Sequence, residues 1–145
     1  MEGRELVDLD FFSVSDPICS LQTRDSNVNH ATWHRIGETE VIDNNLNPKW
    51  IKSFSVWFHF TKDLDLRFMV HNYNDGENDD MIGMTEICLT EIMMADKQQK
   101  FLTLELPESE NKSRKIRNRK NRGSLLVKAG KVKKTEDIIK FQISA

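Results

Sequence analysis

The sequence predicts an all-β protein: an antiparallel β-sandwich of eight short strands with one short helix. Apolar residues recur with a period of two over short stretches, which is the pattern of half-buried strands. Polar turn formers separate these stretches at regular spacing, and no strand–helix repeat is present, which argues against a parallel sheet. The chain has 145 residues, of which 38% are hydrophobic and 30% charged. It therefore suits a single domain, residues 1–145, with a substantial core.

The expected elements follow from local patterns. Phe54, Val56 and Phe58 alternate with polar or amphipathic residues and give the clearest half-buried strand. Residues 90–98 are expected to form the helix, with Thr90 as its cap. In the second strand, Trp33, Ile36 and Val41 are expected to face the core. The expected strands are residues 18–23, 32–42, 54–60, 64–71, 81–89, 101–106, 125–127 and 139–143.

An oxygen-rich loop separates two of these strands. Residues 72–83 read Asn-Tyr-Asn-Asp-Gly-Glu-Asn-Asp-Asp-Met-Ile-Gly, with Gly76 among many side-chain oxygens. Calcium takes six to eight hard oxygen ligands, so a loop of this kind between strands is a candidate calcium site. A solvated polar hairpin loop is the alternative. An EF-hand is disfavoured, because strands flank the loop and Ile82 stands where the closing Glu would be needed.

Charge is distributed unevenly along the chain. Residues 1–110 carry a net charge of −12, and residues 111–145 carry +10. A basic run lies inside residues 107–123, which are expected to form a flexible loop. An anionic membrane attracts each Lys or Arg by about 1 kcal/mol, so this run is a candidate for binding acidic lipid or an acidic protein. The run comprises Lys112, Arg114, Lys115, Arg117, Arg119, Lys120 and Arg122.

Other readings of the composition are less favoured. The basic run could be a solvated loop, and nucleic-acid binding is not expected, because the body is acidic and aromatic residues do not interleave with the basic ones. No stretch approaches the roughly 18 apolar residues of a membrane span, and the N-terminus is not a signal peptide. Cys19 and Cys88 are interpreted as free thiols in a reducing compartment, so a cytoplasmic protein is expected. No nucleophile–base pair or phosphate-binding glycine loop is present, so an enzyme is not expected.

Three stretches resemble a C2 domain. They are residues 10–17 with the pattern DxxxxSDP, residues 44–54 (NNLNPKWIKSF) and residues 70–83 (VHNYNDGENDDMIG). Residues 37–50, 66–74 and 79–92 are, more narrowly, similar to the first of the two C2 domains of copines. The resemblance implies a C2-type sandwich that binds phospholipid in a calcium-dependent way. It also implies a monomeric peripheral membrane protein, recruited from the cytoplasm to phosphatidylserine-like lipid of the plasma membrane.

The resemblance also implies site residues. The calcium ligands would be Asp10, Asp16, Asn72, Asn74 and Asp80, and Phe11 and Phe12 would insert into lipid unless one of them packs in the core. Both central ligand positions, which are Asp in the family, are Asn in this chain. Because calcium affinity depends on ligand charge, the site should be weak, or lost as an independent sensor. A calcium-independent module that binds acidic lipid or protein through the basic run is therefore the alternative function.

The ends of the chain depart from the family pattern. A copine-type C2 domain begins with a strand before the first acidic loop, whereas this chain begins almost inside that loop. The run DIIKFQIS near the C-terminus is similar to the opening strand of the second copine C2 domain. Either the chain is a fragment or short isoform of a longer protein, or residues 136–145 fold into the missing first-strand position. The second is expected in the folded state, because an open sheet edge is costly.

Overall fold

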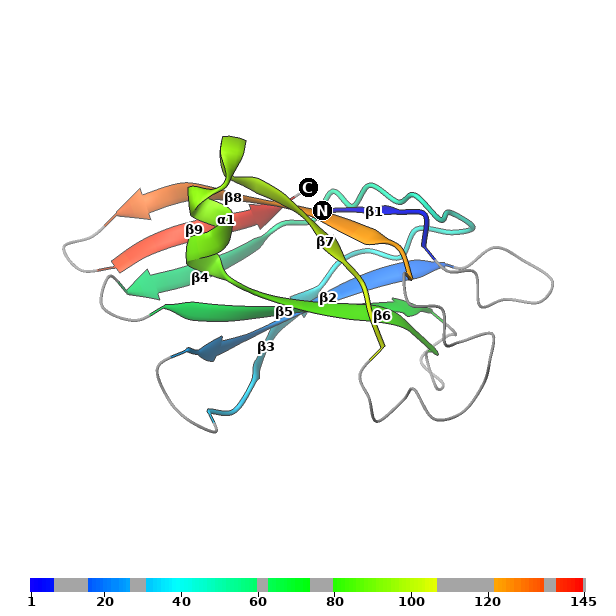
Figure 1. Cartoon of the computed structure of the whole chain (residues 1–145), viewed down its shortest axis with the longest axis horizontal. Helices are drawn as coiled ribbons and strands as arrows, with labels where there is room; N and C mark the ends of the chain where they lie inside the picture. Colours follow the sequence, from blue (N-terminus) through cyan, green and yellow to red (C-terminus); the bar gives the residue numbers. More distant parts are fainter. Residues whose placement is uncertain are drawn as a thin grey trace.

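The computed structural model describes residues 1–6, 16–26, 31–59, 63–73, 80–106, 122–134 and 138–144. In these residues the chain forms nine strands, one α-helix and one turn of 3-10 helix (Figure 1). Eight strands correspond to the expected ones, and a short N-terminal strand is additional. The elements are β1 (Glu2–Arg4), β2 (Pro17–Asp25), β3 (His34–Glu38), β4 (Phe54–His59), β5 (Leu64–Asn72), β6 (Asp80–Cys88), α1 (Leu89–Met94), η1 (Asp96–Gln98), β7 (Gln99–Thr103), β8 (Ser124–Lys134) and β9 (Ile138–Ser144).

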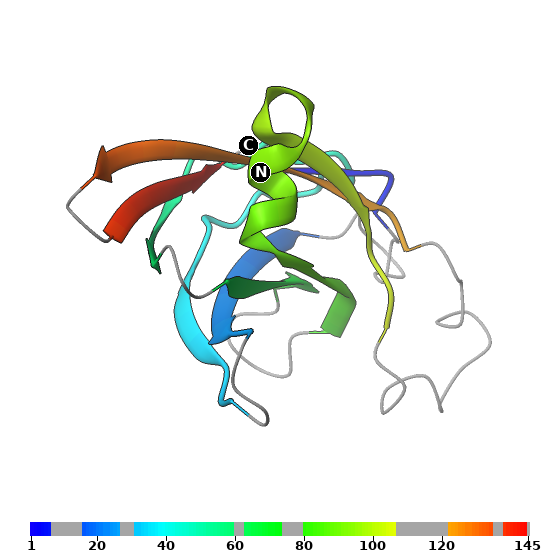
Figure 2. The ribbon, with the colours of Figure 1, turned by 60° about the vertical axis from the view of Figure 1, so that its left-hand side comes forward.

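The strands form two antiparallel sheets that face one another, so the prediction of an antiparallel sandwich is confirmed. One sheet has the order β3-β2-β5-β6, and the other contains β4, β9, β8, β1 and β7. Figure 2 shows the two layers with α1 between them at one side. Two main-chain hydrogen bonds between Met84 and Glu105 link the sheets at the β6–β7 edge. Gly83 permits this close approach, since a Cβ there would lie 2.7 Å from Leu104 Cβ.

Alternation along the strands builds the core, as the sequence predicts. Leu66, Phe68 and Val70 of β5 are fully buried, and the residues between them face outward. Cys19 and Leu21 of β2 meet them from the neighbouring strand. The described cysteines are free thiols as expected. Burial raises the pKa of Cys19 to about 12, so this thiol stays protonated and behaves as a small apolar side chain.

Three details of the sequence prediction are wrong. Thr90 does not cap α1: Cys88 holds the cap position, and the Thr90 hydroxyl donates to Asp63 Oδ1 at 2.9 Å. Ile36 is 39% exposed, because β3 is an edge strand with one sheet neighbour among the described residues. Trp33 lies outside β3, and its ring stacks on arginine side chains of β2 and β5 instead of facing the core.

None of the helices in the described part of the chain is long and apolar enough to cross a membrane.

The two ends of the chain share one position in the second sheet. β7 lies along one edge of β8, and both β1 and β9 pair with the opposite edge. β9 covers the stretch from Lys128 to Lys134, and β1 covers the stretch from Ser124 to Leu126. On its other side β9 pairs with β4, while Glu2 bridges Lys49. Figure 1 accordingly shows the two termini side by side. We call this position between β8 and β4 the shared lane.

We propose that the shared lane takes the place of the first strand of the sandwich, and that residues 136–145 are needed to complete the domain. Ile143 supports this, because its side chain is fully buried in the core cluster. Replacing Ile143 by Ala should lower the free energy of unfolding by about 2–5 kcal/mol, as removal of buried methyl groups does. Urea denaturation measures the change.

A matched control uses the same substitution at Ile51, which is 90% exposed. Ile51→Ala should change the free energy of unfolding by no more than about 0.5 kcal/mol. Removal of residues 138–145 should destabilise the protein more than either substitution. An unchanged urea midpoint after this truncation would contradict the proposal.

We predict that the free energy of unfolding depends on pH because of the N-terminal amine. Met1 is fully buried, and burial lowers the pKa of its amine to about 6. Above pH 8 the amine is neutral in the folded and the unfolded chain, so folding carries no penalty. As the pH falls towards 6, the unfolded amine takes up a proton and the folded one does not. The free energy of unfolding should therefore drop by about 1–2 kcal/mol between pH 8 and pH 6, allowing for screening by solvent.

Acetylation of the amine provides the control for this measurement, since it removes the titrating group. Urea denaturation at pH 6 and pH 8 should show the drop in the free chain and a smaller one in the acetylated chain. Equal slopes in the two forms would show that the Met1 amine does not contribute.

Candidate functional site

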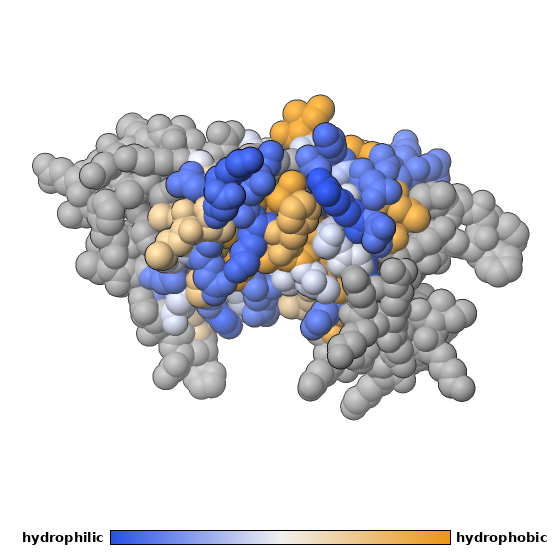
Figure 3. Space-filling model, turned by 45° about the horizontal axis from the view of Figure 1, so that its top comes forward, coloured by the Kyte–Doolittle hydropathy of each residue, from blue (hydrophilic) through white to orange (hydrophobic). Residues whose placement is uncertain are grey.

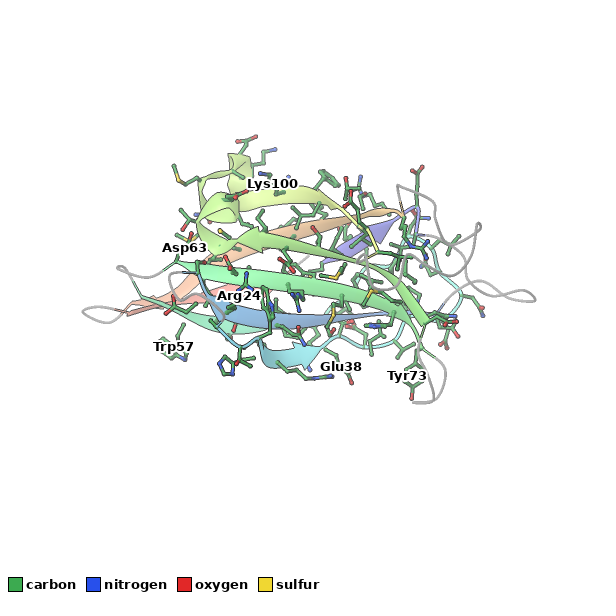
Figure 4. The ribbon with its side chains drawn as sticks, turned by 60° about the horizontal axis from the view of Figure 1, so that its bottom comes forward. Arg24, Glu38, Trp57, Asp63, Tyr73 and Lys100 are labelled. Atoms are coloured by element: carbon green, nitrogen blue, oxygen red, sulfur yellow. The ribbon has the colours of Figure 1, made fainter. Side chains whose placement is uncertain are left out.

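The described ends of three loops meet at one end of the sandwich, which we call the loop end. Loop one (residues 5–16) leads into β2, loop two (residues 39–53) joins β3 to β4, and loop three (residues 73–79) joins β5 to β6. Tyr73 marks this end in Figure 4, and Asp63 marks the opposite end. The first residues of β2 pair with the last residues of β5, and those pair with the first residues of β6. Antiparallel pairing thus brings the described ends of loops one and three together.

The structure places three of the five predicted calcium ligands at the loop end. Asp16 precedes β2, Asn72 ends β5, and Asp80 begins β6 directly opposite Asn72. The predicted ligands Asp10 and Asn74 lie outside the described residues, as do the predicted lipid-inserting residues Phe11 and Phe12. The described part of the chain holds no group of three or more His, Cys, Asp or Glu side chains that could bind a metal.

Asp16 is hydrogen bonded to both other loops. Its main-chain N–H donates to Asn72 Oδ1 at 2.9 Å, and its main-chain oxygen accepts from the N–H of Tyr73 at 2.9 Å. Its carboxylate Oδ1 accepts from the N–H of Asn44, in loop two, at 2.7 Å. Asn72 is fully buried, whereas Asp16 is partly exposed. One residue of loop one therefore sets the distance between loops one, two and three.

The Asn-Pro turn of loop two holds the N-terminal segment. The N–H of Gly3 donates to the Pro48 oxygen at 2.9 Å, and the N–H of Leu6 donates to the Leu46 oxygen at 3.0 Å. Asn47 Oδ1 accepts from the N–H of Glu5 at 3.0 Å. The motif NNLNP thus supplies acceptors to the chain that runs into loop one, a role that its turn propensity alone does not show.

A carboxylate fixes the other end of loop two. Glu40 accepts hydrogen bonds from the N–H groups of Ile51 and Lys52 at 2.8 and 3.3 Å. Burial alone would raise the pKa of Glu40, but these hydrogen bonds to the charged form leave it below its usual value. Loop two is therefore anchored at Glu40, at Pro48 and at Asp16.

The residues of the loop end fit a calcium ion in donor type but only partly in charge. Every predicted ligand offers a hard oxygen, which calcium prefers. Only Asp10, Asp16 and Asp80 bring negative charge, and the oxygen of Asn72 already accepts a hydrogen bond from Asp16. Among the described residues, the loop end thus presents fewer charged oxygens than five aspartates would.

Arg122 must be removed from the predicted lipid-binding set. Its side chain is 1% exposed, and its Nε donates to the main-chain oxygen of Ile82. The main-chain N–H of Arg122 donates to the main-chain oxygen of Leu104 at 3.3 Å. Arg122 and Gly123 therefore belong to the folded body and not to the expected flexible loop. The remaining predicted residues of the basic run, at 112–120, lie outside the described part of the chain.

A second concave surface lies on the outer face of the β3-β2-β5-β6 sheet. It is a cavity of about 190 Å³ lined by Ile18, Ser20, Arg35, Glu38, Met69 and His71. Arg35 pairs with Glu38 at 2.7 Å, and the label of Glu38 in Figure 4 marks this face. Both side chains of this pair are more than half exposed, so the pair contributes little to stability.

An aromatic stack lies on the same face. The guanidinium groups of Arg24 and Arg67 lie 4.2 and 4.0 Å from the ring of Trp33. Asp65 pairs with Arg24 at 3.0 Å, and Glu86 pairs with Arg67 at 2.8 Å. Both cations are thus neutralised within the described structure, and the stack is best explained as packing.

The opposite sheet shows a mixed outer surface. Figure 3 views the molecule from this side and shows hydrophobic surface surrounded by hydrophilic residues. Exposed Met94 and Phe101 belong to α1 and β7. The ring of Phe101 lies under the guanidinium of Arg4, at 4.8 Å. The loop end, where predicted ligands from distant parts of the sequence meet, remains the best candidate site.

Comparison with known proteins identifies the family. The C2 domain model matches residues 1–106. The chain belongs to the C2 domain family. Its relatives include Copine-A of Dictyostelium discoideum (30% identity, 96% of this chain, 21% of that protein) and Copine-E of the same organism (36% identity, 61% of this chain, 16% of that protein). Nicotinic receptor-associated protein 1 of Caenorhabditis elegans is 31% identical over 64% of this chain and 18% of that protein.

Solved C2 domains have the same fold. A single C2 domain of plant Extended Synaptotagmin 1 gives a TM-score of 0.52 at 19% identity, with 99% of this chain and 86% of that chain covered. A calcium-bound fragment of Extended-Synaptotagmin 2 with two C2 domains also gives a TM-score of 0.52, at 18% identity, with 99% of this chain and 42% of that chain covered. The chain spans about a fifth of the length of its copine relatives. The resemblance to copine C2 domains and the C2-type sandwich are therefore confirmed.

The assignment of Asn72 and Asn74 as ligand positions leads to a prediction. Replacing both by Asp adds two negative oxygens to the loop end, so calcium affinity should rise about tenfold or more. Isothermal titration calorimetry measures the affinity. The double variant Asn44→Asp with Asn45→Asp is the control: it adds two carboxylates to loop two, at positions outside the predicted ligand set. A gain of equal size from the control would show that overall charge, and not ligand position, is responsible.

Proposed function

We propose that this C2 domain is a peripheral membrane-docking module that binds anionic phospholipid of the phosphatidylserine type through its loop end. The observation that carries the proposal is the meeting of Asp16, Asn72 and Asp80 at one end of the sandwich. C2 domains generally bind calcium and phospholipid through loops of this kind. Membership of the C2 domain family favours a binding module over an enzyme.

Calcium would connect the loop end to the lipid. The carboxylates of Asp10, Asp16 and Asp80, with the amide oxygens of Asn72 and Asn74, are the residues that would hold it. When bound, calcium supplies positive charge between these carboxylates and lipid phosphate. Because two of the five positions are neutral, we expect weak binding. Phe11 and Phe12, next to Asp10 in the sequence, are proposed to enter the lipid interface, where burial of a Phe side chain contributes about 1.5–3 kcal/mol.

The proposal includes a location and an assembly state. A monomer would move from the cytoplasm to the plasma membrane, where anionic lipid is concentrated on the inner leaflet. Membrane attraction would come from the loop end and from the basic run. No nucleic-acid partner is proposed, since residues 1–110 carry a net charge of −12.

A second candidate is a calcium-independent module that binds acidic lipid or an acidic protein. The net charge of +10 on residues 111–145 favours it. The binding residues would be Lys112, Arg114, Lys115, Arg117, Arg119 and Lys120. At about 1 kcal/mol each near an anionic membrane, they could hold the chain without calcium.

Sedimentation with phosphatidylserine vesicles distinguishes the two candidates. The measurement uses calcium and then chelator, each at low and at physiological salt, with phosphatidylcholine vesicles as the neutral control. The first candidate predicts binding that requires calcium and persists at physiological salt. The second predicts equal binding in calcium and chelator, and a loss of binding at higher salt, because exposed charges are screened.

A charge-reversal variant of the basic run sharpens the result. Replacing Arg117, Arg119 and Lys120 by Glu should abolish calcium-independent sedimentation and leave calcium-dependent sedimentation largely intact. Absence of sedimentation under every condition would argue against both candidates.

A further inference from the structure

The strongest unexplained feature of the loop end is the set of hydrogen bonds centred on Asp16. The N–H of Asp16 donates to Asn72 Oδ1, the N–H of Tyr73 donates to the Asp16 oxygen, and the N–H of Asn44 donates to the Asp16 carboxylate. Their donor–acceptor distances are 2.9, 2.9 and 2.7 Å, within the normal range. We call these three bonds the loop clasp. It connects described residues of all three loops.

Burial explains why an amide suits the central position of the clasp. Asn72 is 0% exposed, and burial of a hydrogen-bonded amide costs far less than burial of a carboxylate. An aspartate at position 72 would lie directly opposite Asp80 in the β5–β6 ladder and next to Asp16. Like charges directly opposite in antiparallel strands are destabilising. Three carboxylates at this point would repel one another unless a cation were bound. With an amide in place of one carboxylate, this repulsion is much smaller.

We propose that Asn72 makes the assembly of the loop end independent of calcium: its amide oxygen joins loop one to strand β5 by a hydrogen bond, so no metal ion is needed to hold these two segments together. This concerns the regulation of the loop end, so it rests on the function proposed above. Calcium then changes only the charge of a loop end that is already assembled. Asn72 is a positioning residue that acts through the main chain of Asp16.

Amide hydrogen exchange tests the clasp directly. In chelator, the amides of Asp16, Asn44 and Tyr73 should exchange slowly, and calcium should change their rates less than about threefold. The variant Asn72→Ala removes the acceptor and should speed exchange at Asp16 by about tenfold or more. The amide of Ile42, which donates to the Pro17 oxygen at 3.2 Å, is the internal control and should keep its rate. Free exchange at Asp16 in the unmodified protein in chelator, followed by protection in calcium, would overturn the proposal.

Thermal unfolding of two matched variants separates the hydrogen bond from the charge. Asn72→Asp should lower Tm by roughly 5 °C in chelator, and calcium should restore most of the loss. Asn72→Ala should also lower Tm, and calcium should restore none of it. The unmodified protein should show nearly the same Tm in calcium and chelator. A calcium-dependent rise in its Tm as large as that of Asn72→Asp would contradict the inference.

The vesicle experiment keeps this inference distinct from the proposed function. Failure to sediment with vesicles, combined with a protected Asp16 amide in chelator, would reject the proposed function and support the clasp. Calcium-dependent sedimentation combined with an unprotected Asp16 amide in chelator would support the proposed function and reject the clasp.

Discussion

The sheet that contains β4 and β8 depends on a strand between them. Main-chain N–H and C=O groups over an apolar core need partners, because unpaired polar groups in such a place are expensive. In this protein the partners come from both ends of the chain, β9 over most of the length and β1 over the remainder. Met1 and Ile143 then lie in one core cluster although they stand at opposite ends of the sequence. The position of loop one follows from this arrangement, because β1 leads directly into it.

The loop end has fewer carboxylates than five aspartates would give, and hydrogen bonds hold its described residues in place. Calcium-binding loops usually contain several carboxylates that repel one another until a cation is present. Here the buried amide of Asn72 accepts a hydrogen bond from the main-chain N–H of Asp16. If the two proposals made above hold, a domain built in this way keeps its proposed docking surface assembled at low calcium concentration. What calcium can still alter is the electrostatic potential that an anionic membrane meets.

Much of the fold could be predicted because it follows local rules. The alternation in β5, with Leu66, Phe68 and Val70 buried, is visible in the sequence and holds in the structure. The grouping of Asp16, Asn72 and Asp80 came from the resemblance to C2 domains, and the strand pairing agrees with it. Two of the errors arose where a distant contact decided the outcome. Thr90 resembles a helix cap but bonds to Asp63, and Arg122 ends a basic run but is buried against Ile82. A run of like charges does not reveal which of its members is taken into the core.

The register of the shared lane has a topological consequence. Ser144 lies opposite Lys128 and Glu2 lies opposite Leu126 on the same edge of β8. A single uninterrupted strand through this position would therefore hold one residue between Ser144 and Glu2, opposite Val127. The N-terminus and the C-terminus of the chain therefore lie within one strand position of the sheet and not at a turn between two strands. A circular permutant that joins Ser144 directly to Met1, and so omits Ala145, would supply this one residue. With new termini at a turn elsewhere, it would keep every strand neighbour that the fold now has.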